Sequence, residues 1–213
     1  MTRALNFNWV GDGPLPVYFT RYFSGVWRRR LPGYAQKVWR WPEGVAGDGY
    51  GEGVSRAVAH LLAKPDGYRN RFGYGKLSLA SDLYKYYLFS LRGGIWLDMD
   101  TFPVCTQEVF DELQGMRLFR VIRANYKGRP DNFFFGGSPP PCLRGKVEAN
   151  CAMTLGDADY VDWTSALSGG NPTGIPMVCE NGRWNRGAEF VGFNWSRGNR
   201  YIRHGFKGVG SCM

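Results

Sequence analysis

The 213-residue sequence has no run of eighteen consecutive apolar residues, so we expect no segment that spans a membrane. Residues 1–7 lack the long apolar stretch and the small-residue cleavage site of a secretory signal peptide, and we expect a cytoplasmic protein. The five cysteines are scattered, odd in number and without a Cys-x-x-Cys pair, and the chain has only two histidines. These counts argue against a disulfide framework and against a zinc site built from cysteine and histidine.

Aromatic and basic residues are abundant instead. Hydrophobic residues make up 44% of the chain and aromatic residues 16%, which predicts a packed globular protein rather than a disordered one. The length suits one domain, and we expect it to cover residues 1–213. The formal net charge is +9. A charge of this sign attracts phosphate-rich partners such as a nucleotide, a nucleic acid or an anionic membrane surface, without choosing among them.

Hydrophobic periodicity predicts strands that alternate with helices, which is typical of one α/β layer structure. The expected strands are 5–10, 34–41, 95–97, 116–123, 131–137, 189–194 and 200–204. The expected helices are 15–30, 54–63, 78–91 with Ser78 as N-cap and Leu91 on the apolar face, 107–113, 143–153 and 158–167.

Two glycine-containing segments are predicted to be loops, at 44–53 and 64–75. The first has five glycines but does not match the dinucleotide-binding pattern G-x-G-x-x-G, because Glu52 stands at the third glycine position. No convincing strand leads into it, so we reject a Rossmann cofactor site here.

The strongest chemical pattern lies at residues 82–100. Asp82 and Lys85 are one helical turn apart and share a face. Gly93-Gly94 then reverses the chain, and a buried strand leads to Asp98 and Asp100. Because side chains alternate along extended backbone, we expect both carboxylates on the same side. Paired carboxylates at a strand end suit a hard cation such as Mg²⁺ or Mn²⁺ that also binds substrate phosphates.

The stretches A-S-D-L-Y-K (80–85) and G-G-I-W-L-D-M-D (93–100) resemble the DxD-motif sugar transferases of the GT-A type. That superfamily includes bacterial capsular and lipopolysaccharide sugar transferases, fungal outer-chain mannosyltransferases and the large clostridial glucosylating toxins. Its pattern is A-S-D-x-x-R followed by G-G-x-Y-x-D-x-D. The resemblance implies a Rossmann-like GT-A domain with a mixed, mostly parallel sheet. It also implies a hexosyltransferase-like enzyme that uses Mn²⁺ or Mg²⁺ to move a sugar from a nucleotide-sugar donor to a hydroxyl acceptor, with retention.

The resemblance also implies a role for each matching residue. Trp9 would stack on the base of the donor. Asp82 would accept hydrogen bonds from donor hydroxyls, and Lys85 would contact the diphosphate or the sugar. Asp98 would reach sugar and ribose hydroxyls mostly through water, and Asp100 would bind the metal directly.

Weaker matches extend over most of the chain. N-W-V-G (8–11) resembles the opening strand, and the segment that begins at Asn132 resembles the one that lines the sugar pocket. T-G-I-P (173–176) resembles a T-G-P turn of the family. His204 and Ser211 match a C-terminal element that closes on metal and diphosphate, and either would complete the metal site of Asp98 and Asp100. Two departures from the pattern matter for the site: Lys85 replaces an arginine, and Cys212 a tryptophan.

Simpler interpretations remain open beside these. Trp9 is about as consistent with a core position as with base stacking. Without the family pattern, Asp82 and Lys85 would be an exposed helical ion pair, and His204 a structural residue at a strand end. The acceptor is a glycan, a glycolipid or a hydroxymethylated DNA base, since the small size, the basic composition and the glycine-containing loops 44–53 and 64–76 suit each of them. The alternative function is a non-catalytic, basic nucleic-acid-binding protein.

Overall fold

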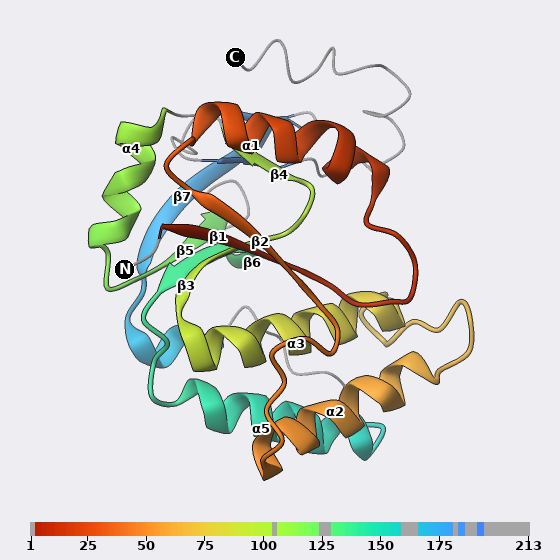
Figure 1. The fold of residues 1–213 in the computed structure, drawn as a ribbon. Coiled ribbons are helices and arrows are strands. Elements are labelled where there is room, and N and C mark those ends of the chain that lie inside the picture. Colours follow the sequence, from red (N-terminus) through yellow and green to blue (C-terminus); the bar gives the residue numbers. More distant parts are fainter. Residues whose placement is uncertain are drawn as a thin grey trace.

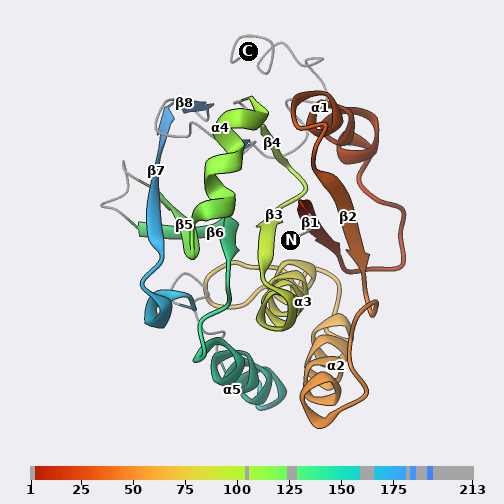
Figure 2. The ribbon, with the colours of Figure 1, turned by 60° about the vertical axis from the view of Figure 1, so that its left-hand side comes forward.

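A central sheet lies between two layers of helices in the structure, which is a computed structural model (Figure 1). It describes residues 3–103, 106–123, 129–158, 166–180, 183–185 and 191–193. Helices α2 (Gly49–Leu62), α3 (Lys76–Arg92) and α5 (Leu143–Leu155) cover one face of the sheet. Helices α1 (Ser24–Arg30) and α4 (Gln107–Asp111) lie on the other face, as the turned view confirms (Figure 2).

The main sheet is mixed and mostly parallel, as predicted. Its strands, in spatial order, are β2 (Ala35–Arg40), β1 (Ala4–Trp9), β3 (Gly94–Leu97), β6 (Arg129–Gly137), β5 (Leu118–Arg123), β7 (Thr173–Glu180) and β8 (Arg183–Asn185). β1 pairs in parallel with both β2 and β3, and β5 pairs in parallel with β7. β6 runs antiparallel to β3 and β5, and β8 runs antiparallel to β7. Within the described residues, all strands of this sheet except β6 and β8 therefore point the same way.

Smaller elements complete the described part of the chain. A π-helical turn, η1 (Phe19–Phe23), leads into α1, and a 3-10 turn, η2 (Glu112–Gly115), follows α4. Another 3-10 turn, η5 (Ser168–Gly170), precedes β7. β4 (Thr101–Pro103) pairs antiparallel with β9 (Val191–Phe193) in a separate two-stranded sheet. No helix in the described ranges is both long and apolar enough to cross a bilayer.

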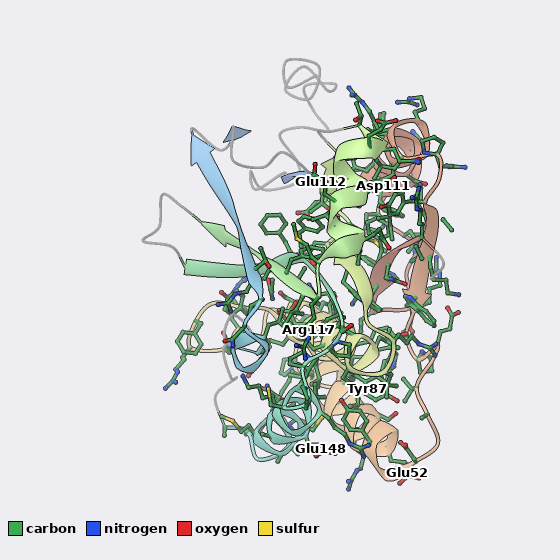
Figure 3. All side chains as sticks on the ribbon, turned by 90° about the vertical axis from the view of Figure 1, so that its left-hand side faces the viewer. Glu52, Tyr87, Asp111, Glu112, Arg117 and Glu148 are labelled. Carbon is green, nitrogen blue, oxygen red and sulfur yellow. The ribbon has the colours of Figure 1, made fainter. Side chains whose placement is uncertain are left out.

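Alternation along β1 separates two hydrophobic cores. Leu5 and Phe7 point into the core shared with α1 and α4, whereas Val10 joins the core under α2, α3 and α5. The second core buries α3 on most of its circumference, so that polar and aromatic side chains of this helix lie inside the protein. Tyr87 lies between the helices, whereas Glu52 and Glu148 lie on their outer surface (Figure 3).

The N-terminus of α2 corrects the prediction of a flexible loop at 44–53. The helix begins at Gly49, because the carboxylate of Asp48 accepts a hydrogen bond from the Gly51 N–H at 2.8 Å and caps the first turn. Gly51 packs directly against the Ala46 carbonyl, and a Cβ there would lie 2.0 Å from that oxygen. Gly51 therefore permits close packing at the helix start, and only the first part of the segment is loop.

Several other boundaries differ from the prediction. The N-cap of α3 is Gly75, three residues before the expected Ser78, and Leu91 is exposed instead of facing the core. The helical run expected at 15–30 begins at Val17 and contains the π-helical turn η1. The helix expected at 107–113 changes to a 3-10 turn after Asp111.

The segment 173–176 is not a turn but the start of β7, because it pairs with β5. β9 falls within the strand expected at 189–194. Most of the helix expected at 158–167, and all of the strand expected at 200–204, lie outside the described residues.

Candidate functional site

The candidate site lies at the edge of the sheet where β1 and β3 end. The two strands are parallel, with Leu5 opposite Ile95 and Asn6 opposite Trp96, so Trp9 and Asp98 both follow them toward the same edge. This edge, beyond the carboxyl ends of parallel strands, is where open α/β sheets bind ligands. The sequence predicted Asp98 and Asp100 at such a strand end, and the structure brings Asp82 and Lys85 to the same edge.

A two-glycine turn explains how α3 reaches this edge. Gly93 and Gly94 have φ angles of 61° and 86°, a region in which residues with a side chain are strained. A Cβ on Gly93 would also lie 2.8 Å from the Gly137 carbonyl oxygen. The turn lays α3 back along β3 in the opposite direction, so that Asp82 and Lys85 return to the end where Asp98 emerges.

Lys85 links three elements of the site. Its side chain is 1% exposed, and its Nζ lies 2.6 Å from Asp98 Oδ1 and 3.4 Å from Asp82 Oδ1. The same ammonium group donates to the backbone carbonyl of Asn132 in β6 at 3.0 Å. A lysine ammonium has three donors, and three oxygens surround it. We call Asp82, Lys85 and Asp98 the Lys85 cluster.

Electrostatics keep Lys85 charged inside the protein. Burial alone lowers the pKa of a lysine, but the charges of Asp98 and Asp82 and their hydrogen bonds outweigh burial and raise the pKa of Lys85 above its usual value. The ammonium ion is thus stabilised by its partners rather than by water.

Asp98 and Asp100 lie in a turn and not on the strand. β3 ends at Leu97, and the Thr101 N–H and hydroxyl both donate to the Asp98 carbonyl, at 3.1 Å and 2.5 Å. The Asp98 N–H donates to the Phe133 carbonyl at 2.9 Å. Strand alternation therefore does not position these carboxylates, because both follow the end of β3; that they lie on one side stays a prediction. Hydrogen bonds of the turn position Asp98 instead.

Tyr18 is a residue of this edge that the sequence reasoning did not identify as part of the site. Burial raises the pKa of its hydroxyl, and the negative charges of Asp100 and Asp98 raise it further. Both carboxylates therefore act on one phenol, which keeps its proton and remains a hydrogen-bond donor. Tyr18 immediately precedes η1, and its sequence position showed only an apolar place in a helical pattern.

Asn8 is a second such residue, and it positions the part of α3 that carries Asp82. Its buried side-chain amide donates to the Ser81 carbonyl at 2.9 Å and lies 2.8 Å from the Ser81 hydroxyl oxygen. These bonds join the end of β1 to the residue that precedes Asp82. β1 carries two asparagines, Asn6 and Asn8, among apolar residues, and a polar side chain in such a strand is the signal that would have found it.

Trp9 occupies an intermediate position that suits both of its interpretations. Its ring is half-buried and packs against the core that contains Leu5 and Phe7. Its indole N–H donates to the Gly13 carbonyl at 3.2 Å. Base stacking by Trp9 stays a prediction, as does donor binding by the Asn132 side chain. His204 and Ser211 lie outside the described residues.

The residues fit a divalent cation that is shared with a substrate. No group of three or more His, Cys, Asp and Glu side chains converges as a metal site among the described residues. Mg²⁺ is nevertheless usually held by one or two carboxylates, several waters and substrate phosphates. Asp98 and Asp100, both part-exposed, are donors of that kind.

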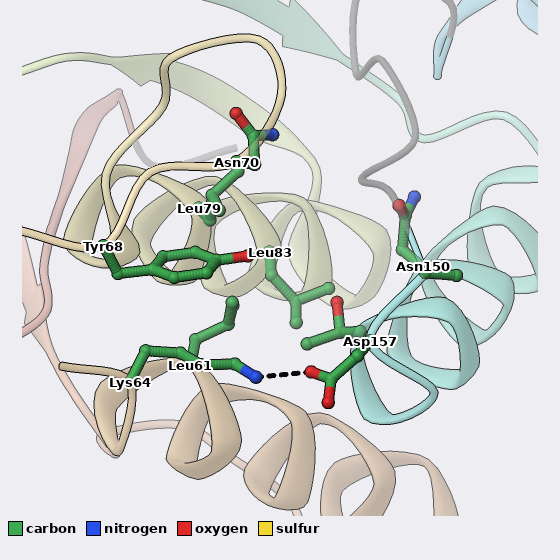
Figure 4. A pocket seen from close by; sticks show the side chains of 10 residues that line it. Leu61, Lys64, Tyr68, Asn70, Leu79, Leu83, Asn150 and Asp157 are labelled. Atoms are coloured by element: carbon green, nitrogen blue, oxygen red, sulfur yellow. Dashed lines mark hydrogen bonds and ion pairs between the residues drawn. The ribbon is translucent and has the colours of Figure 1, made fainter.

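A separate small cavity lies between α2, α3 and α5 (Figure 4). Its volume is about 40 Å³, and Lys64, Tyr68, Asn70 and Asp157 are among its lining residues. Sites for small organic ligands usually measure about 300–1,000 Å³. This cavity is therefore too small for a nucleotide sugar, and none of the carboxylates at the sheet edge lines it.

No model of a protein family matches the chain, and no curated protein matches it. Among solved structures, the chain is similar to one described as "PaToxG Glycosyltransferase", with a TM-score of 0.50 and 11% sequence identity. The similarity covers 78% of this chain and 65% of the other, so the chain spans slightly less than two thirds of the matched structure. At this identity the similarity concerns the fold, and it confirms the predicted GT-A-like α/β class.

Proposed function

We propose that the chain is a glycosyltransferase that moves a sugar from a nucleotide-sugar donor to a hydroxyl group, with Mn²⁺ or Mg²⁺ at Asp98 and Asp100. The Lys85 cluster is the observation that carries this proposal. It fixes Asp82 and Asp98 at the carboxyl ends of parallel strands, where α/β sheets commonly bind ligands, in a fold similar to that of a solved glycosyltransferase structure. The DxD resemblance of the sequence supports the same reaction, with retention at the anomeric carbon.

Each residue of the site then has a distinct role. Asp98 and Asp100 would hold the cation, which supplies charge neutralisation for the departing nucleoside diphosphate when it is bound. The Asp82 carboxylate, 17% exposed, accepts hydrogen bonds from hydroxyls of the donor sugar. The Tyr18 hydroxyl, which keeps its proton at this edge, would donate a hydrogen bond to the substrate.

Lys85 acts as a positioning residue in this proposal. Its three donors already face Asp98, Asp82 and the Asn132 carbonyl, so it orients the two carboxylates rather than the substrate. This role differs from the direct donor contact that the resemblance implies. Reacting groups must be held closely, because a misplacement of about 1 Å can cost roughly 100-fold in rate.

Donor binding and hydrolysis test the proposal directly. Thermal unfolding of the protein with UDP-, GDP- and dTDP-sugars, each with and without Mn²⁺, should show one donor that raises the melting temperature only with metal. Metal-dependent hydrolysis of that donor should fall at least about 100-fold in Asp98→Asn and in Asp100→Asn. Glu148→Gln, which alters an exposed carboxylate on α5, is the matched control and should keep full activity. Undiminished hydrolysis with both Asp98 and Asp100 replaced would refute the proposal.

A further inference from the structure

An exposed apolar patch lies where α2 connects to α3. The connecting segment, residues 63–75, is called here the α2–α3 loop, and Leu77 follows it in the first turn of α3. Phe72, Tyr74 and Leu77 are 54%, 50% and 50% exposed. Single exposed apolar side chains are ordinary, but three within six residues form a patch that marks an interaction site.

Hydrogen bonds hold the loop in a defined shape. The Asn70 side-chain oxygen accepts from the N–H groups of Phe72 and Tyr74, at 3.0 Å and 2.9 Å. The Asn70 N–H donates to the Tyr74 carbonyl at 3.0 Å, and the Gly73 N–H donates to the Asn70 carbonyl at 2.9 Å. The aromatic side chains are thus presented outward on a closed turn, so that binding through them requires little further ordering.

The base of the loop is also fixed. Lys76 donates to Asp66 at 2.9 Å and to the Lys64 carbonyl at 2.7 Å. Lys64 in turn forms an ion pair with Asp157 (Figure 4). The loop is therefore attached to the first residue of α3 and, through Lys64, to the segment after α5.

The charge of the loop is positive at its tip. Arg69 and Arg71 are exposed, and the Arg71 guanidinium lies 4.7 Å from the centre of the Phe72 ring. The acidic residue of the loop, Asp66, is paired with Lys76. The exposed apolar side chains are therefore accompanied by exposed guanidinium groups, on a chain whose net charge is +9.

The loop lies at the same end of the molecule as the candidate site. α3 runs opposite to β3, so its first residue is near the edge at which Asp98 emerges. Lys76 precedes Asp82 by six residues, which is about 9 Å along a helix. Figure 1 shows the loop extending beyond that end of α3.

We propose that the α2–α3 loop docks the protein on an anionic membrane surface. Phe72, Tyr74 and Leu77 enter the interface, while Arg69 and Arg71 lie among the phosphate headgroups. Leu77 favours a bilayer over a nucleic acid, because bases would stack on the two rings but gain nothing comparable from an aliphatic side chain. This docking is independent of the proposed reaction. If both hold, the acceptor hydroxyl is presented at the membrane surface.

Vesicle flotation tests the docking without any sugar donor. The protein should float with phosphatidylcholine vesicles that contain phosphatidylglycerol, and much less with phosphatidylcholine alone. Phe72→Ser/Tyr74→Ser/Leu77→Ser should weaken binding at least about tenfold, because three apolar side chains that would be buried in the bilayer are lost. Arg71→Gln should weaken it roughly fivefold at low salt. Leu91→Ser is the matched control, since Leu91 is 46% exposed at the opposite end of α3, and it should bind as the wild type does.

Three results would overturn the proposal. The first is no binding of the wild-type protein to the anionic vesicles, and the second is equal binding by the triple variant. The third is binding to a single-stranded oligonucleotide that the triple variant loses while the vesicles remain unbound, which would assign the loop to nucleic acid. The metal-dependent thermal shift of the triple variant with the donor is measured in parallel. Because it should equal that of the wild type, loss of docking is distinguished from misfolding and from failure of the proposed reaction.

Discussion

Replacing Lys85 with methionine should remove the charge that holds two carboxylates together while keeping most of the side-chain volume. Loss of one member of a buried ion pair costs about 3–5 kcal/mol. The Asp98 side chain is 36% exposed, so water solvates part of the abandoned charge, and we expect the lower end of this range, about 3 kcal/mol. For a chain of this size the melting temperature should fall by roughly 6–12 °C.

The dependence of this loss on pH distinguishes an ionic role of Lys85 from a packing role. Because the pKa of Lys85 is raised in the folded state, its contribution is fully present below the ordinary lysine pKa of about 10.4 and is lost as the pH rises through the higher folded pKa. The difference in unfolding free energy between wild type and Lys85→Met, measured in urea, should therefore stay constant from about pH 6 to about pH 10 and decline above that.

Activity gives the second measurement on the same variant. Asp82 and Asp98 lose their common partner in Lys85→Met, so kcat should fall roughly 100-fold while the thermal shift produced by the donor changes less. Lys85→Arg, which restores the charge, should recover part of both stability and kcat. A Lys85→Met protein that unfolds like the wild type and keeps its kcat would refute the reasoning.

Two further predictions concern the turn and the cysteines. Gly93→Ala should lower the free energy of unfolding by about 1–3 kcal/mol, because φ is 61° there and the new Cβ meets the Gly137 carbonyl. Urea denaturation measures this loss. A loss no larger than that of Ala158→Gly would contradict the prediction. Burial raises the pKa of the Cys151 thiol to about 11, so its thiolate is scarce at neutral pH, whereas Cys142 is exposed. Alkylation followed by mass spectrometry should modify Cys142 first and Cys151 only at higher pH or after unfolding, and equal rates in the folded protein would show that Cys151 is accessible.

The helix, the glycine turn and the strand at residues 76–97 could be predicted from the sequence because their signals are local. Helical spacing, two adjacent glycines and a short apolar run follow one another along the chain. The pairing of Asp82 with Lys85 followed from helical geometry alone.

The burial and the full set of partners of Lys85 could not be predicted as well. Helical spacing alone suggested an exposed ion pair, whereas the structure buries Lys85 and adds Asp98 and the Asn132 carbonyl as partners. The nearly continuous apolar and aromatic sequence of residues 83–89 indicates a helix that is buried on all sides, and this signal would have corrected the suggestion.

Elements that depend on distant partners could not be predicted. β7 contains a glycine and a proline, which are local signals for a turn, and it becomes a strand through pairing with β5, some fifty residues earlier. Tyr18 precedes η1, far along the chain from the turn after β3, and the charges of Asp98 and Asp100 act on it only through the fold. In α2 the glycines suggested flexibility, whereas Asp48 caps the helix by accepting a hydrogen bond from the Gly51 N–H.

The helical segment between Lys85 and the Gly93-Gly94 turn has a length that determines where the Lys85 ammonium group lies relative to Asp98. At one end of the segment, Gly93 and Gly94 adopt backbone conformations that only glycine adopts easily. At the other end, Lys85 lies within hydrogen-bonding distance of Asp98. Inserting a single residue between them would rotate Lys85 by about 100° and shift it by about 1.5 Å, so its ammonium group would no longer face Asp98. The length of this segment is therefore as strictly constrained as the identity of the residues at its ends.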